Sequence, residues 1–194
     1  MLCMIFPHTL YHPEQNFQAR FIVMPTQSGL INTTPLAIQY DRVLQDPYED
    51  STIGLWDSLL NVYFDANSWI VTPQKPQETN TRPNFVIERL WENNTFIKVI
   101  VVEAKPQQQT MEQDHQTDEQ LLSYSLNALH TGQQKGQRKI YALRVVGVYI
   151  MTYMVSINQP SLTPMVSDYM DSKQHAAAIV QIFDTIKAAD VLVP

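Results

Sequence analysis

The fold of this chain is set first by two runs of β-forming residues that flank a short Asn-containing segment. The runs are Asn84–Leu90 and Phe96–Glu103, and Asn93 and Asn94 lie between them. Val, Ile and Phe favour extended backbone, whereas Asn tolerates the backbone angles of tight turns. The pattern therefore predicts an antiparallel β-hairpin.

Helical and strand patterns on both sides of the hairpin predict an α/β (α+β) fold. Their alternation along the chain favours a mixed β-sheet flanked by helices. We expect one domain over residues 1–194, with an irregular N-terminal arm over 1–48 and a core over 51–190. The expected helices cover residues 34–44, 51–65, 117–130 and 171–189, and the other expected strands cover 69–72 and 140–155, the latter split at Gly147.

Charge and cysteine content narrow the classes of function. The chain has 13 basic and 19 acidic residues and a net charge of -6, which argues against the uniformly basic surface of a DNA-coating protein. One cysteine cannot form an internal disulfide, and the first residues lack the pattern of a secretory signal. No apolar segment is long enough to span a membrane. We therefore expect an intracellular protein, cytoplasmic or nuclear, without a membrane partner.

The end of the second β run carries the residues of greatest chemical interest. Glu103 and Lys105 are two positions apart, so strand alternation puts both side chains on one face. A carboxylate can hold a hard divalent cation through oxygen, and an ammonium group beside it can orient a water molecule and stabilise charge on a phosphate. A Glu-x-Lys triplet alone is common, and a solvated strand end is its ordinary interpretation.

The expected hairpin register adds a third side chain to this pair. With the turn between the two runs, Leu90 pairs near Phe96. Asn84 then lies across from Val102 or Glu103, at the open end of the hairpin, where opposite residues are close neighbours. Asn84 and Glu103 are therefore expected to present two oxygen-bearing side chains to one metal ion.

A pair of helical residues follows the hairpin along the chain. Gln120 and Tyr124 are four positions apart in the expected helix over 117–130, so they lie one turn apart on one face. Side chains so placed are suited to contacting a substrate or to fixing a lysine on the preceding strand.

Together these residues resemble the PD-(D/E)xK nuclease superfamily, which has the restriction-endonuclease-like fold. The resemblance covers residues 82 to about 155, and the spacing of Gln120 and Tyr124 is similar to that of the RecB-type exonuclease branch. It implies a restriction-endonuclease-like core and hydrolysis of phosphodiester bonds in DNA or RNA. It also implies Mg²⁺ or Mn²⁺ as the cofactor and nucleic acid as the partner.

The resemblance assigns roles to individual residues of this chain. It implies that Glu103 is a catalytic metal ligand and that Lys105 is the catalytic lysine beside the attacking water. Gln120 and Tyr124 become the catalytic helix pair. Arg82, Lys105 and Gln120 are the expected contacts with nucleic acid.

Two further metal ligands are implied by the family pattern. One is an acidic residue of the first core helix, for which Asp57 is the first candidate and Glu49 its alternative, because nothing in the sequence fixes the register there. The other is the Asp of the Pro-Asp pair, which corresponds to Asn84. Glu88 lies on the same strand face as Asn84, but four residues span roughly 13 Å, which is too far to replace it at one ion.

The replacement of that Asp by Asn84 leaves several interpretations open. An amide oxygen can ligate a cation, but the site loses one negative charge, and Mg²⁺ affinity depends on ligand charge. The chain is then either a nuclease with weakened activity or a catalytically inactive interaction module, with a protein partner, that kept the nuclease fold. A third interpretation is an unrelated α+β domain in which the Glu-x-Lys triplet is a coincidence.

Overall fold

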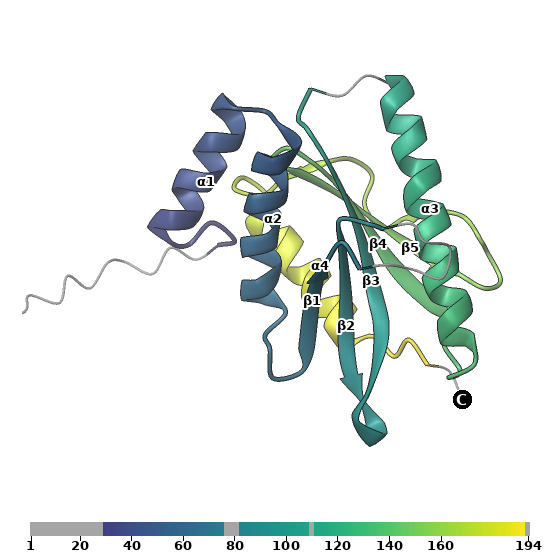
Figure 1. The fold of residues 1–194 in the computed structure, drawn as a ribbon. Helices are drawn as coiled ribbons and strands as arrows, with labels where there is room; N and C mark the ends of the chain where they lie inside the picture. Colours follow the sequence, from purple (N-terminus) through teal and green to yellow (C-terminus); the bar gives the residue numbers. More distant parts are fainter. Residues whose placement is uncertain (1–28, 76–81, 109–110, 193–194) are drawn as a thin grey trace, which may run out of the picture.

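A mixed β-sheet with helices on both faces forms the described part of this chain (Figure 1). In the computed structural model, the described residues are 29–75, 82–108 and 111–192. They contain a seven-stranded sheet and four α-helices. The predicted α/β (α+β) class, a mixed sheet flanked by helices, is confirmed. Residues 1–28, which make up most of the expected N-terminal arm, lie outside the described residues.

The elements follow one another in the predicted order, with shifted ends. The helices are α1 (Thr34–Gln45), α2 (Glu49–Tyr63), α3 (Met111–Gln133) and α4 (Ala176–Ala188), and η1 (Glu92–Asn94) is a 3-10 turn. The strands are β1 (Trp69–Pro73), β2 (Phe85–Trp91), β3 (Thr95–Lys105), β4 (Lys139–Val146), β5 (Tyr149–Ser156), β6 (Thr163–Pro164) and β7 (Met170–Asp171). None of the helices in the described ranges has the length and apolar character needed to cross a membrane.

The sheet has one parallel pair among antiparallel neighbours. The strand order is β1-β2-β3-β4-β5-β6, and β7 pairs with β5. Only β3 and β4 run parallel, and α3 is the crossover that joins them. The carboxyl ends of β3 and β4 therefore meet at one edge of the sheet, beside the beginnings of α2 and α3 (Figure 1).

The predicted hairpin register is confirmed. Leu90 pairs with Phe96, and Asn94 at the turn has φ of 56°, in the left-handed region that Asn tolerates. A β-bulge then shifts the pairing, because Ile87 faces Ile100 while the next residue of β2 faces Lys98. One extra residue in β3 reverses the faces of all the residues that follow it in that strand.

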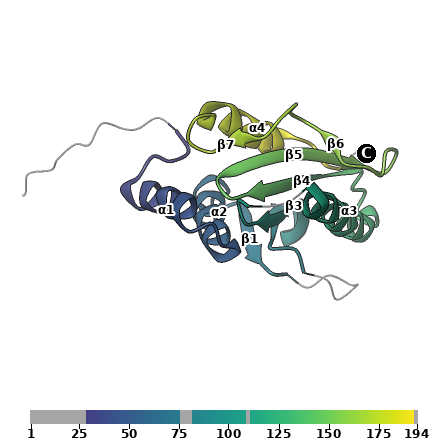
Figure 2. The same cartoon turned by 90° about the horizontal axis from the view of Figure 1, so that it is seen from above.

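Two hydrophobic cores lie on opposite faces of the sheet (Figure 2). The main core joins one face to α1, α2 and α4, and the smaller core joins the other face to α3. Because of the bulge, the later odd-numbered positions of β3 face α3. The main core includes Leu55, Trp56, Phe85, Ile100, Val102 and Phe183, and the smaller core includes Val101, Leu121, Ala128, Ile140, Ala142 and Tyr153.

The expected short helix over 34–44 is α1, but it is not part of an irregular arm. Leu36, Tyr40 and Val43 are buried in the main core. The Tyr40 hydroxyl donates a hydrogen bond of 2.8 Å to the Asp171 carboxylate. An apolar stripe and one buried hydrogen bond therefore attach α1 to the domain.

The last helix starts later than the sequence predicts. Asp171 belongs to β7, and its Oδ1 accepts the backbone N–H groups of Lys173 and Gln174. This arrangement caps a turn rather than the helix itself, so α4 begins only at Ala176.

Gly147 ties three elements together at the edge where β3 ends. It lies in the β4–β5 turn with φ of 59°, which confirms the predicted split of the 140–155 strand. Its carbonyl accepts the Trp56 indole N–H at 2.8 Å, and its N–H donates to the Lys105 carbonyl at 3.0 Å. One residue therefore connects α2 to the end of β3.

Trp56→Phe is expected to lower the free energy of unfolding by about 1–3 kcal/mol, because it leaves the Gly147 carbonyl without its buried donor. Urea denaturation followed by circular dichroism measures this. Val62→Ala, at an exposed position of the same helix, is the control and should change the free energy by less than about 0.5 kcal/mol. Equal effects of the two substitutions would contradict the anchoring role of Trp56.

Candidate functional site

A buried ion pair lies at the end of β3. Lys105 Nζ donates to Glu103 Oε1 at 2.7 Å, and the side chains are 21% and 6% exposed, respectively. The second carboxylate oxygen, Oε2 of Glu103, is buried and has no hydrogen-bond partner among the described residues. Glu103 therefore has one neutralised oxygen and one oxygen that still lacks a positive or donating partner.

Burial controls the protonation of this carboxylate. It raises the pKa of Glu103 above the usual value, because the charged form is poorly solvated. The hydrogen bond and positive charge of Lys105, followed by the nearby backbone N–H of Asn84, lower this pKa without cancelling the effect of burial, and the charge of Glu49 raises it further. A nearby cation would favour the charged form of Glu103.

Asn84 lies beside Glu103, as the hairpin register predicts. Its Oδ1 accepts the backbone N–H of Ala104 at 2.7 Å. The side-chain oxygen therefore already has a donor, and it fixes the start of β2 against the end of β3.

The two candidate acids of α2 have different positions. Glu49 is the first residue of α2, is exposed, and acts on Glu103 through its charge. Asp57 lies eight residues later, roughly 12 Å along the helix axis, and its carboxylate accepts a hydrogen bond from Asn61 at 3.1 Å. The structure thus brings Glu49 toward Glu103 and leaves Asp57 farther along the helix.

Of the two residues that the sequence predicts on α3, Tyr124 interacts with the ion pair and Gln120 has no described hydrogen bond to it. The pKa of Tyr124 is raised, first by burial and then by the charge of Glu103, with Lys105 acting in the opposite direction. Tyr124 is therefore close enough to sense both charges. Gln120 is exposed, and no described hydrogen bond joins it to Glu103 or Lys105.

Arg82 and Glu88 have no described contact with the ion pair. Arg82 is exposed and stands two positions before Asn84 in the sequence. Glu88 is buried and forms an ion pair with Lys75, so its carboxylate is committed there. This agrees with the expectation that Glu88 does not replace Asn84 at one ion.

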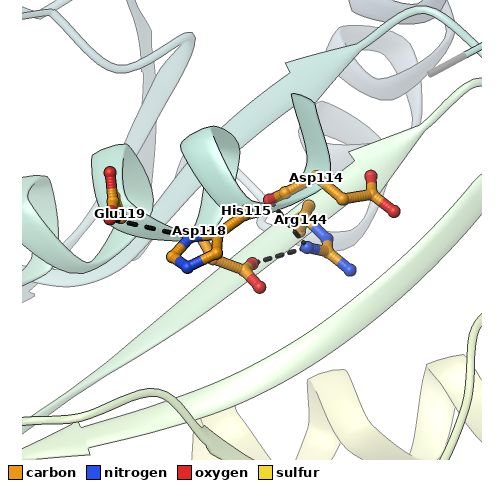
Figure 3. Close-up of polar contacts among 5 residues, drawn as sticks. All are labelled: Asp114, His115, Asp118, Glu119 and Arg144. Carbon is orange, nitrogen blue, oxygen red and sulfur yellow. Dashed lines mark hydrogen bonds and ion pairs between the residues drawn. The ribbon is translucent and has the colours of Figure 1, made fainter. Parts of the chain in front are cut away.

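Arg144 is a buried charged residue that the sequence did not single out as functional. It pairs with Glu103 in the parallel β3–β4 register and is 7% exposed. Its Nη1 donates to Asp118 Oδ1 at 2.6 Å and to the Asp114 carbonyl at 3.3 Å, both on α3 (Figure 3). Arg144 therefore holds the first half of α3 over the sheet. The sequence signal was a charged residue inside an otherwise apolar strand.

Few carboxylates surround the ion pair. Within the described ranges, no group of three His, Cys, Asp or Glu side chains is arranged to hold a metal ion. The acidic side chains associated with the centre are Glu103 and Glu49, and Asn84 contributes an amide.

Comparisons with known proteins identify no family. No family model and no curated protein matches this sequence. Among solved structures, the chain is similar to a chain in a cryo-EM structure of a DrdV–DNA complex, with 11% sequence identity and a TM-score of 0.47. The similarity covers 81% of this chain and 14% of that chain, so this chain corresponds to a small part of that protein's length.

Glu103→Gln is expected to become more stable relative to the unsubstituted protein as the pH rises. A carboxyl group whose pKa is higher in the folded state binds more protons there, so its contribution to stability is lost as the pH passes upward through the usual carboxylate range and the folded-state pKa. Urea unfolding of both proteins at acidic and neutral pH, without divalent cations, measures the difference. A difference that does not change with pH would contradict the burial effect on Glu103.

Proposed function

We propose that this chain is a nuclease-like domain of the PD-(D/E)xK type that hydrolyses phosphodiester bonds in DNA or RNA with Mg²⁺ or Mn²⁺. The observation that carries the proposal is the buried Glu103–Lys105 pair, in which one carboxylate oxygen lacks a partner. A carboxylate and an ammonium group at one strand end have the chemistry that such a reaction needs.

The residues present fit a divalent cation. A buried carboxylate oxygen without a partner is costly unless it receives a proton or a positive ion. Mg²⁺ keeps several waters and commonly uses one or two protein carboxylates, so Glu103 with Glu49 would suffice, and Asn84 would add an amide oxygen if it gave up the Ala104 N–H. The bound ion would stabilise negative charge on the phosphate and lower the pKa of a water ligand.

The other side chains supply positioning and charge. Lys105 would place its ammonium group beside the attacking water and the phosphate, and its bond to Glu103 fixes that position. Tyr124, on α3, is close enough for its pKa to respond to the charges of Glu103 and Lys105. Arg82 and Gln120, both exposed, would contact the strand at the rim of the site.

The overall charge limits how nucleic acid would bind. At a net charge of -6 the chain has no general attraction for a polyanion, so contact would rely on a few cations near the site, such as Arg82 and Lys105. Binding through few phosphate contacts has a shallow dependence on salt.

A second candidate is a catalytically inactive interaction module with the same fold. The hydrogen bond from Ala104 N–H to Asn84 Oδ1 favours it, because this oxygen already serves the backbone. Asn84 is then a structural residue at the position of a metal ligand in the family pattern, and the ligand set would be incomplete.

Asn84→Asp is expected to tighten Mn²⁺ binding by roughly tenfold, equivalent to about 1.4 kcal/mol, and to create or increase cleavage. One carboxylate oxygen can keep the Ala104 N–H while the other adds negative charge for the cation. Calorimetry with Mn²⁺ and cleavage of end-labelled DNA and RNA measure the two effects. Lys105→Ala in the Asn84→Asp background should abolish cleavage. No Mn²⁺ binding and no cleavage in any of these proteins would reject the nuclease proposal in favour of the module.

Glu49→Gln is expected to weaken Mn²⁺ binding in the Asn84→Asp background, whereas Asp57→Asn should leave it unchanged. The two substitutions each remove one charge from the same helix, but Glu49 contributes to the raised pKa of Glu103, and Asp57 lies eight residues farther along the helix. The same calorimetric titration compares them. A larger effect from Asp57→Asn would show that the acid from this helix was assigned wrongly.

A further inference from the structure

A pocket of about 300 Å³ borders the candidate site at the shared end of β3 and β4. Val146 at its wall pairs with Lys105 in the parallel register, and Gln107 follows Lys105 by two positions. Asp114, Tyr149 and Tyr169 complete the lining. A molecule in this pocket would therefore lie next to a group held at Lys105.

Two buried polar atoms of the lining lack partners. The Tyr169 hydroxyl and Gln107 Oε1 have no hydrogen-bond partner among the described residues. Burial and the nearby Asp114 charge raise the pKa of Tyr169, against the lowering effect of Arg144, so its hydroxyl stays protonated. Because both atoms are buried, the groups that a ligand in the pocket would contact are the tyrosine rings and the Asp114 side chain.

The charge of the lining decides the class of ligand. Asp114 is the single charged residue among the described residues of the lining, and Figure 3 shows the Asp114 carboxylate directed away from Arg144. Arg144 lies over the Tyr169 ring at 5.0 Å and is bound to Asp118, so its charge is already matched. A negative pocket disfavours phosphate and favours an uncharged group that carries N–H donors.

We propose that this pocket holds a nucleobase of the strand whose phosphate lies at Lys105. The inference rests on the proposed nuclease function. Tyr149 and Tyr169 supply aromatic surface, on which unstacked bases bind with little dependence on sequence. Asp114 accepts from an exocyclic amino group, as acidic side chains do from cytosine. Thymine binds more weakly, because its ring N–H is flanked by two carbonyl oxygens that the carboxylate repels.

Fluorescence anisotropy with short labelled single strands, in EDTA so that no cleavage occurs, tests this pocket. Strands of dC or dA are expected to bind at least about fivefold more tightly than strands of dT or abasic strands. Asp114→Asn should remove the difference between dC and dT, and Tyr169→Leu, which removes the aromatic ring, should weaken binding of every strand that carries bases. Tyr63→Leu, which removes a tyrosine ring at the last residue of α2, is the matched control and should change nothing. Thermal unfolding verifies that each variant is folded.

The outcomes separate this inference from the function on which it rests. Equal binding of base-carrying and abasic strands, unchanged in Asp114→Asn and Tyr169→Leu, would overturn the nucleobase pocket even if metal-dependent cleavage is found. Free nucleosides that bind as tightly as the strands would overturn it in favour of a small-molecule site. If no strand binds and Asn84→Asp shows no cleavage, the pocket and the nuclease proposal both fail.

Discussion

A buried carboxylate with only half of its hydrogen-bonding capacity satisfied organises this end of the molecule. Glu103 is driven into the interior by a strand that is apolar on both faces, and burial of its charge is affordable only because Lys105 follows it on the same face. The bulge in β3 directs both side chains toward α3 rather than into the main core. Charge, strand geometry and helix packing together therefore determine the position of the ion pair between Glu103 and Lys105.

The sequence predicted those features of the fold and the site that depend on residues close together along the chain. The hairpin, its register and the association of Asn84 with Glu103 followed from β-forming runs and turn chemistry, which act over a few residues. The choice between Glu49 and Asp57 did not, because the position of α2 depends on a contact from Trp56 to a turn that lies 91 residues away. Arg144 and the pocket near Tyr169 escaped prediction for the same reason: their neighbours come from elements that only the tertiary fold assembles.

The Asn84 side-chain amide is compatible with both proposed functions, the metal-dependent nuclease and the inactive interaction module. Asn84 stabilises the junction of β2 and β3 by accepting the Ala104 N–H, and it adds no charge. A carboxylate at this position would repel Glu103, whose charged form is already disfavoured by burial. A metal-binding site tolerates that repulsion because the ion removes it, whereas a binding module gains by avoiding it. The energetic balance at this single position therefore distinguishes an enzyme from a scaffold.

The two hydrogen bonds of Gly147 have a mechanical consequence. Gly147 holds α2 through Trp56 and holds β3 through the Lys105 carbonyl, so the two elements that carry Glu49 and Glu103 share one anchor point. A shift of this turn would therefore move the two acids relative to each other, although the turn contributes no side chain to either. Flexing of that turn would widen or narrow the grip on any ion without altering a single ligand.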